Sequence, residues 1–517
     1  MSVRRPTLRG LAAVAVIAAW GVSLTLLAFR RMEADDDSQL SLLASRQLAP
    51  EGVFFALMVG NTQVGTAGIT LDTLSPGYRI LETMTLELPT DTGLVKGLWW
   101  TETKLSPSLT LIEAERRFIR DGRRVVGSMR KLGPYTLAMQ VGVDSGRAYA
   151  QGRGDVVPAI ALSYRLALRR NGLGVGGVVD ELVTSGWPGA LMEGFGRSST
   201  DSIIIGPDSS EIDPKTLRFL PVHYDTAKVY RMMISGPAGP YQIWVERTGT
   251  IAAIEYPLGL QWVRTDFDMA LTNYRRDFAA GAHRQVRTAL PRLVPYASST
   301  RSRPAATSDE PRAFRVTRRD GRPIPNSLLT AFSGGRQRVR GDTIWISQDE
   351  RVPDLQGARA SDPFVGQDSI VLNLAEMVKT SPTGAGRIAT ILSTLTRTIT
   401  LDTSYTASQE GLTTLKRKRG RADGIARLFV ALAQASGQKA RYVVGFAVLN
   451  DTLRTHAWAE VWDTEVLGWT AVDPVNGRVA ASTYLIRTGF AGSSHPDDML
   501  PIIADVRLTE LDLKGTP

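Results

Sequence analysis

Two side chains near the C-terminal end of the chain could carry out acid–base chemistry. His456 lies in the stretch THAWAEVWD and Asp473 lies in GWTAVDPV, and both stretches alternate apolar and polar residues as strands do. A histidine on one strand can act as a general base, and an aspartate on the next strand can orient it. We therefore expect His456 and Asp473 to form a dyad across two neighbouring strands.

The nucleophile that such a dyad would serve is missing. A nucleophilic residue at a helix N-terminus benefits from the helix dipole and from unpaired backbone amides that can receive an oxyanion. The stretch KRGRADGIARLF predicts a helix that starts near Ala422, whose methyl side chain cannot act as a nucleophile. The chain contains no cysteine at all, which excludes cysteine nucleophiles, disulfides and thiolate metal sites.

Residues 410–474 resemble a bacterial transglutaminase-like domain of the papain-like thiol-enzyme class. The matching stretches are KRGRADGIA, similar to the family's G-x-C-x-x-x-A, and then LFVALAQASGQKARYVVGF, HAWAEVW and GWTAVDP. The resemblance implies a helix-borne nucleophile packed on an antiparallel sheet. It places the family's base at His456, its orienting aspartate at Asp473 and its cysteine position at Ala422. Helical patterns extend the likeness back to about residue 363.

Without the cysteine, the family's acyl transfer, peptide cleavage or amide crosslinking cannot proceed by its usual route. Three roles stay open for His456 and Asp473: a hydrogen bond that joins two strands, ligand binding in the former cleft, and residual catalysis. Asp423, in the first turn of the predicted helix, is either a plain helix cap or a carboxylate that replaces the thiolate charge opposite His456.

Aromatic and basic residues accompany the former site. Trp458 is a candidate binding residue, although it and two other tryptophans could equally be sheet core; the other two are Trp462 and Trp469. A basic run lies at the edge of the predicted cleft and consists of Lys416, Arg417, Lys418, Arg419 and Arg421. Such a run is usually a solvated face, but it could hold an anionic glycan or a lipid headgroup.

Helices must precede the strands that carry the dyad. Apolar residues recur at spacings of three and four in DSIVLNLAEMVKT and AGRIATILSTLTRTITLD, and a third helix is predicted from Arg421 to Ser436. Strands are predicted in KARYVVGFAVL, THAWAEVWD and GWTAVDPV. Helices followed by three strands indicate an α+β domain, which we place at residues 355–490.

The preceding part of the chain is predicted to be a β-rich domain over residues 45–290. Apolar and polar residues alternate between turn signals such as Gly60-Asn61, which is typical of an antiparallel sandwich or a half-open barrel. The stretch from Ala159 to Arg170 is either a helix or a long strand. Two isolated histidines are expected to be ordinary surface or core residues and not ligands: His223 and His283.

Three further segments complete the C-terminal half. Residues 297–311, ASSTRSRPAATSDEP, are predicted to be a linker because they are rich in Ser, Thr, Pro and Ala. Residues 312–354 are predicted to be a short β segment that either completes the neighbouring sheet or covers the next domain. Residues 491–517 are predicted to be a C-terminal tail.

The N-terminus predicts a membrane anchor. Residues 1–10 form a basic tail, and residues 11–29 carry no charge and would span about 28 Å as a helix. An acidic run follows at residues 33–37, which favours a cytoplasmic N-terminus and an exported body. No small-x-small cleavage site is evident, so we expect an uncleaved signal anchor that crosses the inner (cytoplasmic) membrane once. The bulk of the chain would then be periplasmic or extracellular.

The overall charge is compatible with envelope partners. The formal net charge is +10 and the pI is about 9.8, which suits contact with anionic lipid or polymer. No nucleic-acid motif with interleaved aromatic residues is present, so we expect no nucleic-acid partner. No HExxH or comparable ligand cluster is visible, so we expect no metal and no cofactor.

These patterns together predict a membrane-anchored, exported pseudoenzyme that binds an envelope peptide, polymer or partner protein. One alternative is a hydrolase or peptidase-like enzyme with a nucleophile other than cysteine, for instance water activated by His456 and Asp423. Another alternative is a structural subunit of an envelope assembly.

Overall fold

The computed structural model describes residue 20 and residues 37–279, 296–297, 310–352, 369–402, 411–491 and 505–513, apart from short gaps inside these ranges. Most of the predicted linker lies outside the described residues. The predicted membrane anchor also lies outside them, except for Trp20. In the part of the chain that the structure describes, no helix combines the length and the apolar character needed to cross a membrane.

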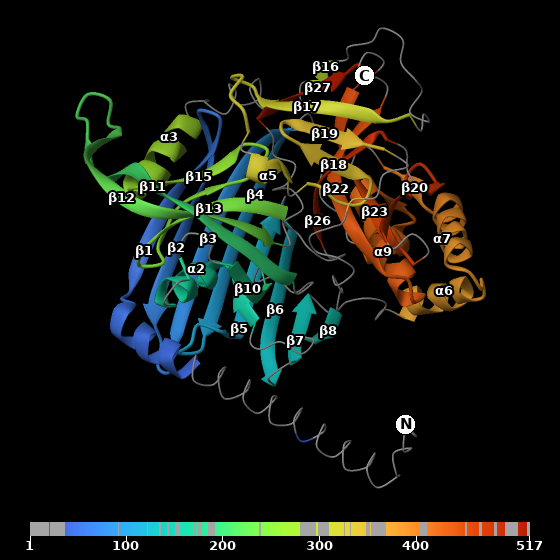
Figure 1. The fold of residues 1–517 in the computed structure, drawn as a ribbon, viewed down its shortest axis with the longest axis horizontal. Helices are drawn as coiled ribbons and strands as arrows, with labels where there is room; N and C mark the ends of the chain where they lie inside the picture. Colours follow the sequence, from blue (N-terminus) through green and yellow to red (C-terminus); the bar gives the residue numbers. More distant parts are fainter. Residues whose placement is uncertain are drawn as a thin grey trace, which may run out of the picture.

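The N-terminal half is built on one large sheet, in which fifteen strands are described (Figure 1). Their order across the sheet is β8-β7-β6-β5-β4-β3-β2-β1-β15-β14-β13-β12-β11-β10-β9. Neighbouring strands are antiparallel, except that β9 and β10 are parallel. The mostly antiparallel β-structure predicted for this half is therefore confirmed. The strands are β1 (Glu51–Val59), β2 (Thr62–Thr73), β3 (Tyr78–Thr90), β4 (Gly93–Leu105), β5 (Leu111–Arg120), β6 (Arg123–Gly133), β7 (Thr136–Val141), β8 (Asp144–Tyr149), β9 (Val156–Pro158), β10 (Val178–Thr184), β11 (Met192–Ile212), β12 (Phe219–Gly236), β13 (Gly239–Glu246), β14 (Ile251–Glu255) and β15 (Leu260–Thr265).

The first hairpin shows how sequence alternation produces this sheet. Val53, Phe55 and Leu57 point into the core, while the residues between them are more exposed. Gly60 has φ +59, a left-handed conformation that glycine adopts without strain, and it reverses the chain between β1 and β2. The predicted turn at Gly60-Asn61 is confirmed.

The large sheet curls around a buried helix. The segment predicted to be either a helix or a long strand is the helix α2 (Ala159–Leu168). Its side chains share one core with β1–β4 and with β12–β15. Val156 of β9 packs with Leu111 of β5 and Leu137 of β7, so the last strand of the sheet approaches strands near its other end. Two short helical segments follow β15: η1 (Met269–Asn273) and α3 (Tyr274–Ala279).

A second, smaller sheet follows, and its five described strands have the order β16-β27-β17-β19-β18. Its β27 comes from the segment that the sequence analysis placed in a C-terminal tail, and it pairs antiparallel with β17. The chain therefore returns to residues 312–318 after completing the C-terminal domain. The elements are β16 (Tyr296–Ala297), β17 (Arg312–Arg318), α5 (Asn326–Thr330), β18 (Gln337–Arg340), β19 (Thr343–Ile346) and β27 (Val506–Leu511).

The C-terminal domain has helices before strands, as predicted. Its main sheet, as far as it is described, has the order β25-β24-β23-β22-β26, so the three predicted strands lie side by side at its centre. β25 and β26 were not predicted. The elements are α6 (Ser369–Lys379), α7 (Gly384–Thr398), β20 (Thr400–Leu401), α8 (Gly411–Arg417), β21 (Arg419–Gly420), α9 (Ala422–Ala435), β22 (Ala440–Leu449), β23 (Thr452–Asp463), β24 (Gly468–Asp473), β25 (Arg478–Val479) and β26 (Leu485–Ala491).

Both faces of this C-terminal sheet are covered. The helices α6, α7 and α9 pack on one face, where Leu428 and Phe429 of α9 meet Ala459 of β23. The second sheet packs on the other face, where Phe314 of β17 shares a core with Trp458 of β23. Figure 1 shows α9 beside β22 and β23, with β17–β19 above them. The dyad therefore lies in a sheet that is sandwiched between helices and a second sheet.

Candidate functional site

The structure brings His456 and Asp473 together as the sequence analysis predicts. His456 Nε2 lies 3.0 Å from Asp473 Oδ2, across the pair β23–β24. The side chain of His456 is 7% exposed and that of Asp473 is fully buried. The dyad is therefore formed, and only the edge of the imidazole reaches solvent.

Strand alternation fixes the face on which the dyad lies. Successive side chains of a strand point to opposite faces of the sheet. Ala457 and Ala459 contact the helical core, whereas Trp458 belongs to the core shared with the second sheet. His456 has the same parity as Trp458, so it lies on the face that the second sheet covers.

Asp473 is held by several donors besides His456. The Tyr484 hydroxyl donates to its Oδ2 at 2.5 Å, and Asn476 Nδ2 donates to the same oxygen at 2.7 Å. The backbone amides of Val475 and Asn476 donate to Oδ1 at 3.1 and 3.3 Å, which forms a turn that ends β24. Asp473 thus joins β24, the following turn and the start of β26.

These contacts determine the ionisation of the site. Burial alone would raise the pKa of Asp473, but the hydrogen bond and charge of His456, together with the donors Tyr484 and Asn476, outweigh it and lower the pKa to about 2. Burial, with the charge and hydrogen bond of Asp473, raises the pKa of Tyr484 above its ordinary value. At neutral pH Asp473 is therefore a carboxylate and Tyr484 a neutral donor.

Trp458 lies beside the dyad inside the protein. Its ring stacks on His456 with centroids 6.3 Å apart, and the side chain is 1% exposed. Gly445 is the strand partner of His456, and a Cβ at this position would collide with the carbonyl oxygen of Ile486 and lie 2.9 Å from the Trp458 ring. Trp458 is therefore enclosed by the strands around it, and it also lines a cavity together with Glu460 and Arg487.

The start of α9 contains Ala422, where the family resemblance places the nucleophile. Ala422 is the first residue of α9 and is half-buried, which confirms the predicted helix start. Arg421 precedes it and makes no side-chain cap. Asp423 lies in the first turn, where a carboxylate favours the helix dipole, and it is 3.8 Å from Arg421. The structure thus pairs Asp423 with Arg421 and pairs His456 with Asp473.

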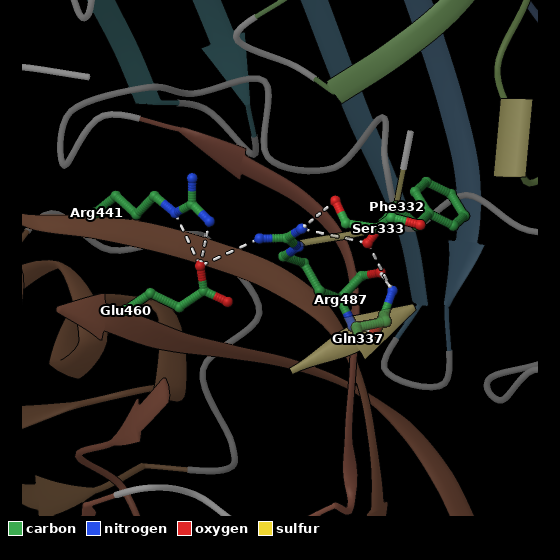
Figure 2. Close-up of polar contacts among 6 residues, drawn as sticks. All are labelled: Phe332, Ser333, Gln337, Arg441, Glu460 and Arg487. Atoms are coloured by element: carbon green, nitrogen blue, oxygen red, sulfur yellow. Dashed lines mark hydrogen bonds and ion pairs between the residues drawn. The ribbon is translucent and has the colours of Figure 1, made fainter. Parts of the chain in front are cut away.

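A buried ionic network, which the sequence analysis missed, lies two residues beyond Trp458 on the same face of β23. Figure 2 shows Glu460 Oε2 between two guanidinium groups: Arg441 Nε donates to it at 2.8 Å and Arg487 Nη1 at 3.2 Å. Arg487 also donates to the carbonyl of Ser333 at 3.0 Å. Gln337 Nε2 donates to the carbonyl of Arg487, and Gln337 Oε1 accepts from the amide of Arg487. The network therefore ties the second sheet to the dyad-bearing sheet.

The signal for this network was present in the sequence but incomplete. Glu460 occupies a position of β23 that alternation assigns to a buried face, and a buried acid requires a cationic partner. The alternation could not reveal which arginines would pair with it, because Arg441 and Arg487 lie on other strands. Tyr484, just before β26, was missed for the same reason, whereas Asn476 lies in the turn directly after Asp473 and its contact is local.

The remaining predicted residues are placed as follows. His223 is 68% exposed and pairs with Asp208 at 2.8 Å, as expected of an ordinary surface residue. Trp469 is buried and packs against Trp462 with centroids 5.4 Å apart. His283 lies outside the described residues.

Comparison with known proteins agrees with this geometry. Residues 373–474 match the family model of the transglutaminase-like superfamily, a range that contains Ala422, His456 and Asp473. This region is a transglutaminase-like domain. The predicted family resemblance is thereby confirmed, and the absence of cysteine from the chain means that the transglutaminase-like domain lacks its nucleophile.

Two solved structures are similar to parts of this chain. One is a β-barrel-like protein of a domain of unknown function from Brucella abortus, with 9% identity and a TM-score of 0.30 over 42% of this chain and 96% of the other. The other is a proposed cysteine protease from Cytophaga hutchinsonii, with 17% identity and a TM-score of 0.24 over 40% of this chain and 65% of the other. No curated protein matches the chain in sequence.

The transglutaminase-like domain therefore holds a histidine and an aspartate in the geometry of a base and its orienting group, in a chain that has no cysteine nucleophile. The Asp473 carboxylate can hold His456 in one orientation, as an orienting group does in a triad. The side chain of Ala422 is a methyl group, which cannot attack a carbonyl carbon. The dyad as it stands joins strands, and acyl transfer by the cysteine route is excluded.

Proposed function

We propose that this protein is a membrane-anchored, exported pseudoenzyme whose transglutaminase-like domain binds an envelope peptide, polymer or partner protein without turning it over. The observation that carries the proposal is Ala422 at the start of α9, in a domain that retains the His456–Asp473 hydrogen bond. A dyad without a nucleophile has no group to activate for covalent catalysis.

The burial of the dyad supports a binding surface elsewhere on the domain. His456 and Asp473 are almost completely enclosed, and Asp473 accepts hydrogen bonds from three residues besides His456. Loss of either partner would leave a buried polar group unpaired, at a cost of about 1–3 kcal/mol. The dyad therefore acts as a clamp between strands, and a partner would bind around the start of α9.

The membrane anchor and the export of the body are part of the same proposal. They are supported by the uncharged residues 11–29, by the basic tail before them and by the acidic run after them. The ligand classes proposed here are those that an exported and anchored protein would meet.

Activity assays test the non-catalytic part of the proposal. The purified full-length chain in detergent should show no hydrolysis of peptide or ester substrates and no amide exchange above a protein-free blank. Hydrolase or transamidase activity that disappears in His456→Asn would contradict the proposal and would favour a nucleophile other than cysteine. Circular dichroism of His456→Asn ensures that lost activity does not reflect lost folding.

A single introduced thiol tests whether the site is intact but disarmed. Because the chain has no cysteine, Ala422→Cys creates its only thiol, and the labelling rate by iodoacetamide reports that position alone. Lys215→Cys, at an exposed turn, gives the reference rate for an ordinary thiol. We expect Ala422→Cys to react faster than this reference below pH 8, and to lose the advantage when His456→Asn is added. Slow labelling of Ala422→Cys that does not change when His456→Asn is added would contradict an intact former site.

A further inference from the structure

A cavity of about 30 Å³ lies between the dyad-bearing sheet and the second sheet. Its buried lining includes Trp458 and Glu460 of β23, and half-buried residues mark its mouth: Arg336, Ser347 and Ala471. A single water molecule needs about 10–15 Å³, so the cavity has room for about two groups of that size. It lies on the face of the sheet that the second sheet covers, opposite the face on which α9 packs.

Trp458 brings a hydrogen-bond donor to this cavity. Its side chain is 1% exposed, and its indole Nε1 has no hydrogen-bond acceptor among the described residues. Its ring stacks on His456, a contact that does not use the N–H group. Buried indole N–H groups usually have a hydrogen-bond partner. A ligand in the cavity would supply the acceptor that the protein does not provide.

Glu460 brings a hydrogen-bond acceptor to the same cavity. In the part of the chain that the structure describes, all hydrogen bonds to its carboxylate go to Oε2, from Arg441 and Arg487. Figure 2 shows the other oxygen, Oε1, turned away from both guanidinium groups. Each carboxylate oxygen can accept hydrogen bonds, so Oε1 can take a donor from a ligand. Because Glu460 follows Trp458 by two positions in β23, both side chains lie on the same face of the sheet.

The charges beside the cavity favour a neutral ligand. A cation would be repelled by the guanidinium groups of Arg441 and Arg487, which already hold Glu460. An anion would face the negative oxygen Oε1 of Glu460. A hydroxyl group suits both unpaired atoms, because it donates through its hydrogen and accepts through its oxygen. A hydroxymethyl group, with one carbon and one oxygen, fills the space of about two water-sized groups.

We propose that the cavity binds the terminal hydroxymethyl group of a neutral sugar. The hydroxymethyl oxygen accepts from Trp458 Nε1 and its hydrogen is donated to Glu460 Oε1, while the sugar ring stays at the mouth beside Arg336 and Ser347. The site goes beyond the proposed function, which places a partner around the start of α9 on the other face of the sheet.

The lining of the cavity favours a sugar over a peptide that carries the same hydroxymethyl group on a serine. Peptides commonly bind by pairing their backbone with unpaired backbone groups of a strand. Gly334 and Gln337 line the cavity, but the amide of each donates to the carbonyl of the other, at 2.8 and 3.1 Å. Side chains dominate the polar groups at the mouth, and side chains of the Arg and Ser type can donate to the hydroxyl groups of a sugar ring.

The indole signal of Trp458 in nuclear magnetic resonance tests the proposal. Full-length protein in a neutral detergent is labelled with nitrogen-15 tryptophan, and Trp458→Phe identifies which indole N–H signal belongs to Trp458. The signal is followed while methyl β-glucoside is added. Methyl β-xyloside is the matched control ligand, because it has the same ring and hydroxyl groups but lacks the hydroxymethyl group.

The two glycosides should behave differently. Methyl β-glucoside should shift the Trp458 signal to lower field until the site is saturated, because the indole N–H gains an acceptor. Methyl β-xyloside should bind at least about tenfold more weakly, because it can make neither of the two buried hydrogen bonds. No saturable shift with methyl β-glucoside, which is the result expected if the cavity holds water alone, would overturn the proposal. Equal binding of the two glycosides would also overturn it.

A cavity-filling variant locates the binding. Ala471→Leu adds three carbon atoms at the mouth and leaves Trp458 and Glu460 unchanged. Ala227→Leu adds the same atoms at a half-buried position of β12, away from the cavity. Ala471→Leu should weaken the binding of methyl β-glucoside by at least about tenfold, whereas Ala227→Leu should leave it unchanged. Undiminished binding by Ala471→Leu would overturn the proposal. The comparison of the two glycosides uses the unaltered protein, so it decides the question even if Ala471→Leu does not fold.

Two further probes test the ligand class. Methyl β-glucuronide carries a carboxylate in place of the hydroxymethyl group and should bind more weakly than methyl β-glucoside; equal binding would overturn the assignment to a neutral group. N-acetylserinamide should also bind more weakly, and tighter binding would assign the cavity to a peptide and overturn the assignment to a sugar. The labelling of Ala422→Cys does not depend on a sugar, so rapid labelling without glucoside binding would remove this inference and leave the proposed function standing.

Discussion

At the scale of residues, the His456–Asp473 dyad stabilises the fold, because Asp473 is an ionised group inside the protein and needs its hydrogen-bond donors. A buried carboxylate is tolerated only when hydrogen bonds and opposite charge compensate for the lost hydration. Here the compensation comes from His456, Tyr484, Asn476 and two backbone amides. Each of these donors would lose its acceptor if the carboxylate were removed. The dyad therefore contributes to the fold without any nucleophile beside it.

The pKa of Asp473 predicts a specific acid dependence of stability. The pKa of Asp473 is about 2 in the folded protein and 3.8 for an aspartate in the unfolded chain. The ionised carboxylate therefore stabilises the fold above about pH 4, and this contribution is lost as the pH falls towards 2. The difference corresponds to about 2 kcal/mol. Asp473→Asn should therefore be less stable than the unaltered protein at pH 7, and the two stabilities should converge in acid. Urea unfolding followed by tryptophan fluorescence measures both.

A surface aspartate provides the control for this measurement. Asp72 is 36% exposed and pairs with Arg79, so Asp72→Asn removes the same charge without affecting the core. Its stability should remain within about 0.5 kcal/mol of the unaltered protein at all pH values. A gap between Asp473→Asn and the unaltered protein that stays constant down to pH 2 would show that the ionised carboxylate is not responsible.

The sequence predicted this site as far as local patterns extend. Ala422, His456 and Asp473 each lie in a short stretch with a recognisable family pattern and a predictable element, so their positions followed directly. Tyr484 could not be predicted, because its contact with Asp473 depends on how β26 enters the sheet beside β22. The long-range partners of a buried polar group depend on strand order, which alternation does not encode.

At the scale of elements, β27 joins the two ends of the C-terminal half. Val506 and Leu508 of β27 are buried in the core that the second sheet shares with the dyad-bearing sheet. β27 lies between β16 and β17, so it is a central strand of the second sheet and not an edge strand. Loss of β27 would open the cover over the face that carries His456 and Trp458.

A matched pair of substitutions in β27 tests its role. Leu508→Asp places a charge in the shared core and should destabilise the protein by at least about 3 kcal/mol. Arg507→Asp introduces the same side chain at the adjacent, exposed position and should cost less than about 1 kcal/mol. Urea unfolding measures both variants. Comparable losses in the two variants would show that β27 contributes through its backbone pairing alone.

Most individual elements followed from periodicity, but their assembly did not. The helix predicted from Arg421 to Ser436 is α9, and the three predicted strands are β22, β23 and β24. The residues of β27 have ordinary strand alternation, yet nothing in this short segment indicates that it pairs with β17, far earlier in the chain. The segment from Ala159 to Arg170 was ambiguous because its apolar residues fit neither period alone, and burial inside the curled sheet explains why most of α2, Ser163 and Arg165 included, is covered.

At the scale of the whole molecule, the two halves are connected through the second sheet. Arg318 of β17 forms an ion pair with Glu255 of β14. The amide of Asp505, just before β27, donates to the carbonyl of Leu258 at 2.5 Å. Gly259 allows this approach, because a Cβ there would lie 2.9 Å from the Cβ of Asp505. The large sheet and the second sheet therefore contact each other through the end of β17 and the residue before β27.

The orientation of the chain in the membrane is the last prediction, and the absence of cysteine makes it directly testable. If residues 11–29 are an anchor with a cytoplasmic N-terminus, Ser2→Cys should be protected in intact spheroplasts and Lys215→Cys should be exposed to the medium. A membrane-impermeant maleimide should label Lys215→Cys before lysis and Ser2→Cys only after it. Background is low because neither variant has another thiol. Labelling of Ser2→Cys in intact spheroplasts with protection of Lys215→Cys would reverse the topology and contradict the proposed export of the body.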